Sequence, residues 1–124
     1  MLVTNKHLFT LDFGPYNYNV HRKVQIRLID AVTTSKKAGI NEMVLHFMGD
    51  YDERYECGDH RRNVVCLIVK LLKTFGNTIK RYEVPDKKLR KYNTTKKEAN
   101  KGKFIRPDEK WLVPDDDKPQ FKFD

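Results

Sequence analysis

Residues 42–48, EMVLHFM, constrain the fold more than any other stretch, because they are apolar on both faces of an extended strand. Met43, Leu45 and Phe47 would point to one side, and Val44, His46 and Met48 to the other. A strand with this pattern is typical of the interior of a sheet. We therefore expect 42–48 to be a central strand, with the rest of the chain arranged around it.

The flanking segments predict two helices and two more strands. Apolar residues spaced three and four apart predict a helix over about 19–38. A broader apolar face, which ends before Gly76, predicts a second helix over about 60–75. Alternation predicts a strand over 8–13, and Pro85 closes a third strand over 78–84.

The order strand, helix, strand, helix, strand predicts an α/β fold of the α+β two-layer sandwich kind, with two helices packed on a mixed sheet. A three-layer form stays open. We expect residues 1–85 to form a compact domain and 86–124 to be a basic segment with a tail. Residues 103–106 or 111–113 could add a further strand to the sheet.

Positive charge is concentrated in one segment, 86–103. It holds eight basic and two acidic residues, a net of +6 in a chain whose total is +8. The 85 residues before it carry +4, and the 21 residues after it carry −2. Clustering of this kind favours a polyanionic partner, of which RNA and DNA are the commonest.

The candidate nucleic-acid-binding residues lie mainly in this segment. Its cations would neutralise phosphates, and Tyr92 would stack on a base. Arg61 and Arg62, at the start of the second helix, would extend the surface. The cations of the segment are Lys87, Lys88, Arg90, Lys91, Lys96, Lys97, Lys101 and Lys103. Two other readings stay open, in which the segment is a solvated loop without a partner or a helix that folds against one.

The sequence contains no complete catalytic or metal site, and we predict no cofactor. Cys57, His60 and Cys66 lack a fourth ligand at zinc spacing, and the loop 49–60 lacks the residue pattern of a calcium loop. His46 lies in an apolar strand and is interpreted as a core histidine. We therefore expect no enzymatic activity.

Two cysteines are too few for a disulfide scaffold, and this favours a reducing compartment. No run of 18 apolar residues is present, so we expect no membrane association. The prediction is a cytoplasmic protein, with an organelle after removal of a transit peptide as the alternative.

Three features resemble a known family. The first strand ends at Phe13-Gly14-Pro15, the first helix ends at Lys37-Ala38-Gly39, and the third strand ends at Glu83-Val84-Pro85. In these respects residues 9–85 are similar to the C-terminal domain of bacterial translation initiation factor 3. That domain has a Phe-Arg-Gly-Arg type motif after its second strand; here Phe47 and Gly49 match and both basic positions are lost. The resemblance implies RNA binding in association with the ribosome.

The same fold shape occurs in Alba chromatin proteins and in small MutS-related (Smr) nuclease domains. Leu11-Asp12-Phe13-Gly14 is similar to the Leu-Asp-x-His-Gly motif of the nucleases but lacks its histidine. This resemblance implies a metal-dependent nuclease that would use Asp12, His46 or Asp50.

The function predicted from the sequence is nucleic-acid binding by phosphate neutralisation, with RNA favoured over DNA and a ribosome-associated role as one form of it. The first alternative is a module that docks a host or partner protein. The second alternative is a small metal-dependent nuclease of the Smr kind.

Overall fold

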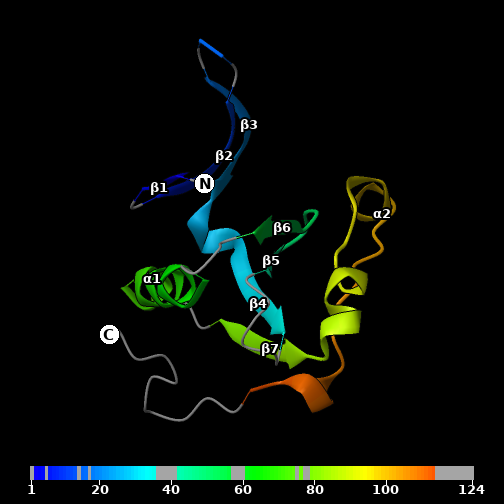
Figure 1. Ribbon diagram of the computed structural model, residues 1–124. Coiled ribbons are helices and arrows are strands. Elements are labelled where there is room, and N and C mark those ends of the chain that lie inside the picture. Colours follow the sequence, from blue (N-terminus) through cyan, green and yellow to red (C-terminus); the bar gives the residue numbers. More distant parts are fainter. Residues whose placement is uncertain are drawn as a thin grey trace.

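The computed structural model describes residues 2–4, 6–13, 15–16, 18–35, 42–56, 61–74, 76 and 79–113. Within them the chain forms seven strands, one long helix and several short helical turns (Figure 1). The strands are β1 (Leu2–Val3), β2 (His7–Phe13), β3 (Tyr18–Gln25), β4 (Ile29–Ser35), β5 (Glu42–Phe47), β6 (Glu53–Glu56) and β7 (Lys80–Val84). The helices are η1 (Ile26–Leu28), α1 (Arg61–Thr74), η3 (Asp86–Lys91), α2 (Lys96–Asn100) and η4 (Glu109–Trp111).

The strands form two sheets. The first has the order β1-β2-β3 and is antiparallel, and its β2–β3 hairpin extends away from the rest of the molecule (Figure 1). The second, which we call the central sheet, has the order β6-β5-β4-β7. In the central sheet β4 and β7 are parallel and the other pairs are antiparallel. The expected combination of α and β structure with a mixed sheet is therefore confirmed.

The helix predicted over 19–38 is wrong. Strand β3, the single turn η1 and strand β4 occupy residues 18–35, and 36–38 lie outside the described residues. Along β3, Arg22 and Val24 are buried while the residues between them are exposed, which is the period of a strand. The segment is also rich in β-branched residues, which favour strands. These are Val20, Val24, Ile26, Ile29, Val32, Thr33 and Thr34.

The other elements agree with the sequence. The helix expected over 60–75 is α1, and the strands expected over 42–48 and 78–84 are β5 and β7. The strand expected over 8–13 is β2, but it lies in the three-stranded sheet instead of beside β5. The loop expected over 49–60 contributes β6, which pairs with β5 as an edge strand.

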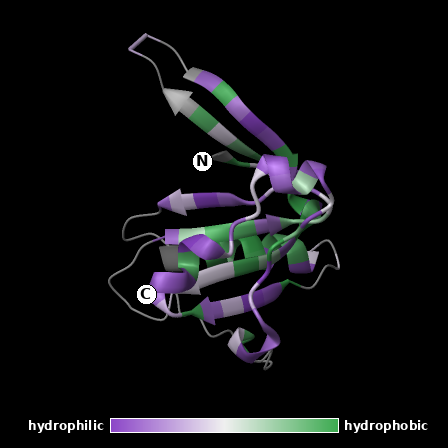
Figure 2. Cartoon of the chain, turned by 90° about the vertical axis from the view of Figure 1, so that its right-hand side faces the viewer, coloured by the Kyte–Doolittle hydropathy of each residue, from purple (hydrophilic) through white to green (hydrophobic). Residues whose placement is uncertain are grey.

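The main core lies between α1 and the central sheet. Val65, Ile68 and Leu72 of α1 are buried in one cluster with Met43, Leu45 and Phe47 of β5. Leu8, Val24 and Tyr55 join this cluster from β2, β3 and β6, so the base of the hairpin is packed into it. Burial of each large apolar side chain stabilises the fold by roughly 1.5–3 kcal/mol. Figure 2 shows hydrophobic residues concentrated in the central strands.

The opposite face of the central sheet is covered by residues 86–113, which we call the extension. Val44 of β5, Val84 of β7 and Leu89 of η3 form a second buried cluster, with Tyr92 and Trp111 packed on it. The central sheet thus lies between α1 and the extension (Figure 1). Of the two helices expected to pack on the sheet, α1 forms, and the face opposite to it is covered by the extension.

The extension also returns to the edge of the sheet. Leu112 forms an isolated antiparallel bridge with Tyr82, and the N–H of Val113 donates to the carbonyl of Arg81 at 2.7 Å. Residues 111–113 therefore extend the sheet by a single bridge beside β7, whereas 103–106 form no strand. The tail from 114 onward lies outside the described residues. No helix in the described part of the chain is long and apolar enough to cross a membrane.

Candidate nucleic-acid interface

Six lysines of the extension are exposed and have no ion-pair partner within 4.0 Å in the described part of the chain. Two lie on η3, and four lie on α2 or directly after it. In Figure 2 the segments in front of the sheet are largely hydrophilic. We call these residues the lysine set: Lys87, Lys91, Lys96, Lys97, Lys101 and Lys103. Within the described residues one member of this set, Lys103, has a charge that helps to lower the pKa of Glu98. These exposed ammonium groups are the part of the predicted interface that the structure brings together.

Of the two other cations of the segment, Arg90 contacts the central sheet and Lys88 contacts another part of the extension. Arg90 donates from Nη2 to Oε1 of Glu42 at 3.0 Å, and Arg54 lies 3.1 Å from the same oxygen. The hydrogen bond from Arg90 is the main reason why the pKa of Glu42 lies below its ordinary value. The ammonium of Lys88 lies 5.6 Å from the centre of the Trp111 ring, within the range of a cation–π contact.

Tyr92 is half-buried against the second core cluster, beside Val44 and Leu89. Its ring belongs to the packing between the extension and the central sheet. It is therefore poorly placed to stack on a base, which was its expected role.

A buried polar network fastens the extension to the central sheet. The N–H of Thr94 donates to Oδ2 of Asp52 at 2.8 Å, and the N–H of Asp52 donates to the carbonyl of Thr94 at 2.9 Å. The hydroxyl of Thr94 accepts from the N–H of Ile105 at 2.7 Å. This bond closes the segment 94–105, which carries four residues of the lysine set. Thr94 and Asp52 are both buried.

His46 continues this network into the sheet. Its Nδ1 lies 2.8 Å from Oδ2 of Asp52, and its Nε2 lies 2.6 Å from the hydroxyl of Thr33. If Asp52 is ionised, its carboxylate can only accept, so Nδ1 of His46 carries the proton in this hydrogen bond. In a neutral imidazole, Nε2 then has no proton and accepts from the hydroxyl of Thr33. Oδ1 of Asp52 has no hydrogen-bond partner among the described residues. The interpretation of His46 as a core histidine fits this burial.

A capping box sets the start of α2. The hydroxyl of Thr95 accepts from the N–H of Glu98 at 3.2 Å, and Oε1 of Glu98 accepts from the N–H of Thr95 at 3.1 Å. This reciprocal pair satisfies two donors that a helix start leaves open. The hydrogen bonds from Thr95 also lower the pKa of Glu98. The lysines of α2 are thereby carried on a defined turn.

The arginines expected to enlarge the surface lie elsewhere. Arg61 and Arg62 begin α1, which covers the opposite face of the central sheet from the extension. Arg22 is on a strand, not a helix, and its side chain is only 5% exposed. Its guanidinium lies 3.6 Å from the centre of the Tyr51 ring and 4.4 Å from that of Phe47, and it pairs with Asp50 and Glu53. Arg22 therefore ties the hairpin to the β5–β6 turn.

Two of the residues considered for nuclease chemistry, His46 and Asp50, are engaged with other partners in the structure. His46 is buried, and Asp50 pairs with Arg22 at 3.4 Å. The side chain of Asp12 and the loop residues Cys57 and His60 lie outside the described part. Among the residues that are described, no three His, Cys, Asp or Glu side chains are grouped so that they could hold a metal ion.

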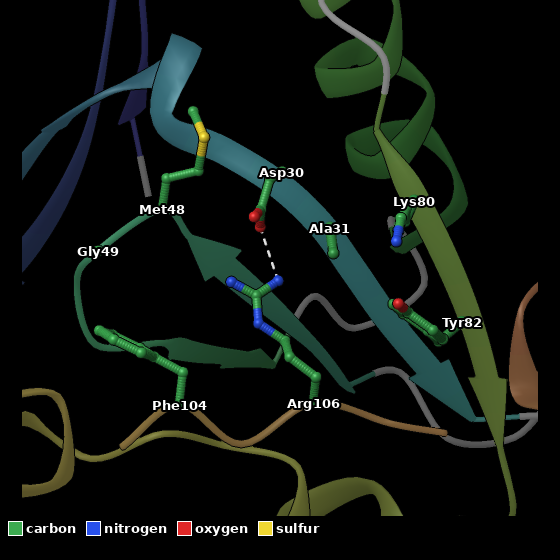
Figure 3. A pocket seen from close by; sticks show the side chains of 8 residues that line it. All are labelled: Asp30, Ala31, Met48, Gly49, Lys80, Tyr82, Phe104 and Arg106. Atoms are coloured by element: carbon green, nitrogen blue, oxygen red, sulfur yellow. Dashed lines mark hydrogen bonds and ion pairs between the residues drawn. The ribbon is translucent and has the colours of Figure 1, made fainter. Parts of the chain in front are cut away.

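A cavity of about 500 Å³ lies at one end of the face that the extension covers (Figure 3). Four of its lining residues are apolar or lack a side chain: Ala31, Met48, Gly49 and Phe104. The other four are polar: Asp30, Lys80, Tyr82 and Arg106.

Two of the polar lining residues, Arg106 and Asp30, form an ion pair. Nη1 of Arg106 donates to Oδ1 of Asp30 at 2.6 Å, and Nη2 donates to the carbonyl of Phe47 at 3.4 Å. Burial raises the pKa of the Tyr82 phenol above its ordinary value. The sequence analysis did not predict this cavity. The one local pattern that points to it is an aromatic residue, Phe104, directly after a lysine, Lys103.

Comparisons with family models, with curated proteins and with solved structures found no match to this chain. The resemblance to the initiation-factor domain therefore stays a prediction. One of its three features, the first helix, is replaced by strands.

Proposed function

We propose that the protein binds nucleic acid, with RNA as the favoured target, by placing the lysine set against the phosphate backbone. The observation that supports this most directly is the exposure of six lysines, without an ion-pair partner among the described residues, on an extension that is itself anchored. Each exposed cation can replace a counterion at one phosphate, so affinity should depend strongly on salt.

Anchoring strengthens the proposal because it lowers the entropic cost of binding. Leu89 is buried in the second cluster, Thr94 bonds to Asp52, and the capping box fixes α2. The backbone that carries the lysines is therefore ordered before a ligand arrives. With only five residues, α2 offers too short a helix to read a major groove along its length. Contacts to the backbone of folded RNA, including ribosomal RNA, suit this arrangement best.

The test is a salt titration of binding to a generic RNA and to duplex DNA. The informative variant replaces Lys96, Lys97, Lys101 and Lys103 with glutamine. A control with the same change in charge replaces Lys6, Lys23, Lys70 and Lys73, exposed lysines outside the extension. The first variant should reduce the slope of log affinity against log salt by about three units, at roughly 0.7–0.9 per lost contact.

The control variant should change that slope by less than one unit. Equal effects of the two variants would mean that total charge, and not the lysine set, governs binding. Absence of binding by the unaltered protein at low salt would overturn the proposal. A nuclease-resistant complex with an acidic protein, lost in the first variant alone, would instead favour the alternative of a protein-interaction module.

A further inference from the structure

The cavity beside the extension has the composition of a site for a flat, partly polar ring. Met48 is 50% exposed and Phe104 is 42% exposed, although both are large and apolar. Both residues belong to the lining of this cavity (Figure 3). The volume of about 500 Å³ lies in the range of small-molecule pockets.

The polar residues that line the cavity offer hydrogen-bond partners. Arg106 has five N–H donors, and the carboxylate of Asp30 can accept several hydrogen bonds beyond the one from Arg106. Lys80 and Tyr82 add an ammonium and a phenol on β7. A ring stacked on Phe104 would have donors and acceptors of both kinds within the same cavity, which is the pattern found on the edge of a nucleobase.

The charges around the cavity fit a nucleotide within a strand. Lys103 directly precedes Phe104, and Lys101 lies two residues earlier, both exposed. On the opposite side, Lys80 is 61% exposed, and its ion pair with Glu109 is long, at 3.6 Å, and exposed, so that a phosphate could replace Glu109. Phosphates on either side of a base at Phe104 would therefore meet cations in both directions.

We infer that this cavity is a subsite for one unstacked base of a single-stranded nucleic acid, with Phe104 as the stacking platform. The inference rests on the proposed function, because the lysine set supplies the phosphate contacts that bring the strand to the cavity. It adds selectivity for single strands, since a paired base cannot leave its stack without a cost in free energy.

The test compares Phe104→Ala with Leu67→Ala, measured by the anisotropy of a labelled oligouridylate and of a labelled duplex. Leu67 is a matched control, because it is apolar, 47% exposed and located on α1, away from the cavity. Phe104→Ala should weaken single-strand binding by roughly 5- to 150-fold with an unchanged salt slope. Phe104→Tyr should retain affinity, and Leu67→Ala should stay within about twofold of the unaltered protein.

The outcomes separate the two proposals. If the unaltered protein binds the single strand and Phe104→Ala binds it equally well, the base subsite is refuted while the proposed function stands. If Phe104→Ala weakens the single strand and the duplex to the same extent, Phe104 supports the surface instead of stacking on a base, and the inference fails. If the unaltered protein binds neither ligand at low salt, both proposals fall. Thermal unfolding of each variant checks that the fold is retained.

Discussion

Nδ1 of His46 lies 2.8 Å from Oδ2 of Asp52, and the two side chains are 0% and 1% exposed. The same carboxylate oxygen accepts the N–H of Thr94. One buried oxygen therefore joins the central strand β5 to the loop that precedes α2. Because the lysines of α2 follow directly after this loop, the position of the proposed binding surface depends on a buried hydrogen-bond network in the fold.

Replacement of Asp52 by alanine should destabilise the protein by roughly 2–4 kcal/mol, because His46 and the N–H of Thr94 lose a buried acceptor. Denaturant unfolding measures the loss, and hydrogen exchange should accelerate at the amides of Thr94 and Ile105. Asp108→Ala is the control, since Asp108 is exposed and its side chain makes no capping bond. A change of less than about 0.5 kcal/mol in Asp52→Ala would show that the network is dispensable.

Arg22 should resist even conservative substitution. Its guanidinium stacks on Tyr51, pairs with Glu53 and donates to the carbonyl of Tyr51 at 2.7 Å. Lysine cannot reproduce this planar fork, so Arg22→Lys and Arg22→Met should both lose about 2 kcal/mol of the free energy of unfolding. The neighbouring exposed residue gives the control, Lys23→Met. Full stability of Arg22→Lys would mean that charge alone holds the hairpin to the β5–β6 turn.

The contact between Arg90 and Glu42 predicts a pH dependence of stability. The pKa of Glu42 is lowered in the folded protein from 4.5, chiefly by the hydrogen bond from Arg90. A carboxyl with a lowered pKa stabilises the fold above its unfolded pKa, and this contribution is lost as the pH falls through the folded pKa. Glu42→Gln should therefore melt below the unaltered protein at pH 6–7, and the difference in Tm should shrink as the pH falls below 4.5 and through the lowered pKa of Glu42.

Because Arg90 is exposed, the difference in Tm at pH 6–7 should be small. It should also shrink in high salt, which screens the pair. Glu109→Gln provides a comparison, since the ion pair between Glu109 and Lys80 is long, at 3.6 Å, and exposed on both sides. A Tm difference for Glu42→Gln that stays constant from pH 3 to pH 7 would contradict the electrostatic account.

The sequence predicted those elements whose patterns are local and whose ends are marked. Helix α1 has a broad apolar face, and β7 ends directly before Pro85, so both could be placed to within a few residues. The helix predicted over 19–38 rests on Val20, Val24, Leu28, Ala31 and Val32, and most of these residues are four apart. A spacing of four is even, so it fits one face of a strand as well as one stripe of a helix.

The candidate site was predictable only in part, because charge clustering is local and pairing is not. The lysine set is visible in the sequence. In contrast, the partner of Arg90 is 48 residues away, and Arg106 and its partner Asp30 are 76 residues apart. The cavity is assembled from β4, β7, the turn after β5 and the extension, and no window of the sequence contains it.

Tyr92 and Phe104 offer the last prediction, because the base-stacking role that the sequence favours for Tyr92 should belong to Phe104. Tyr92 lies in a basic run but is half-buried against Val44, Val84 and Leu89. Tyr92→Ala should therefore lower the free energy of unfolding by roughly 1–3 kcal/mol, less than the cost for a fully buried aromatic. At a temperature where the variant is folded, its affinity for oligouridylate should stay within about twofold of the unaltered protein. Phe104→Ala should show the reverse, with stability nearly unchanged and single-strand affinity reduced. A Tyr92→Ala variant that is fully stable but binds tens of times more weakly would instead make Tyr92 the stacking platform.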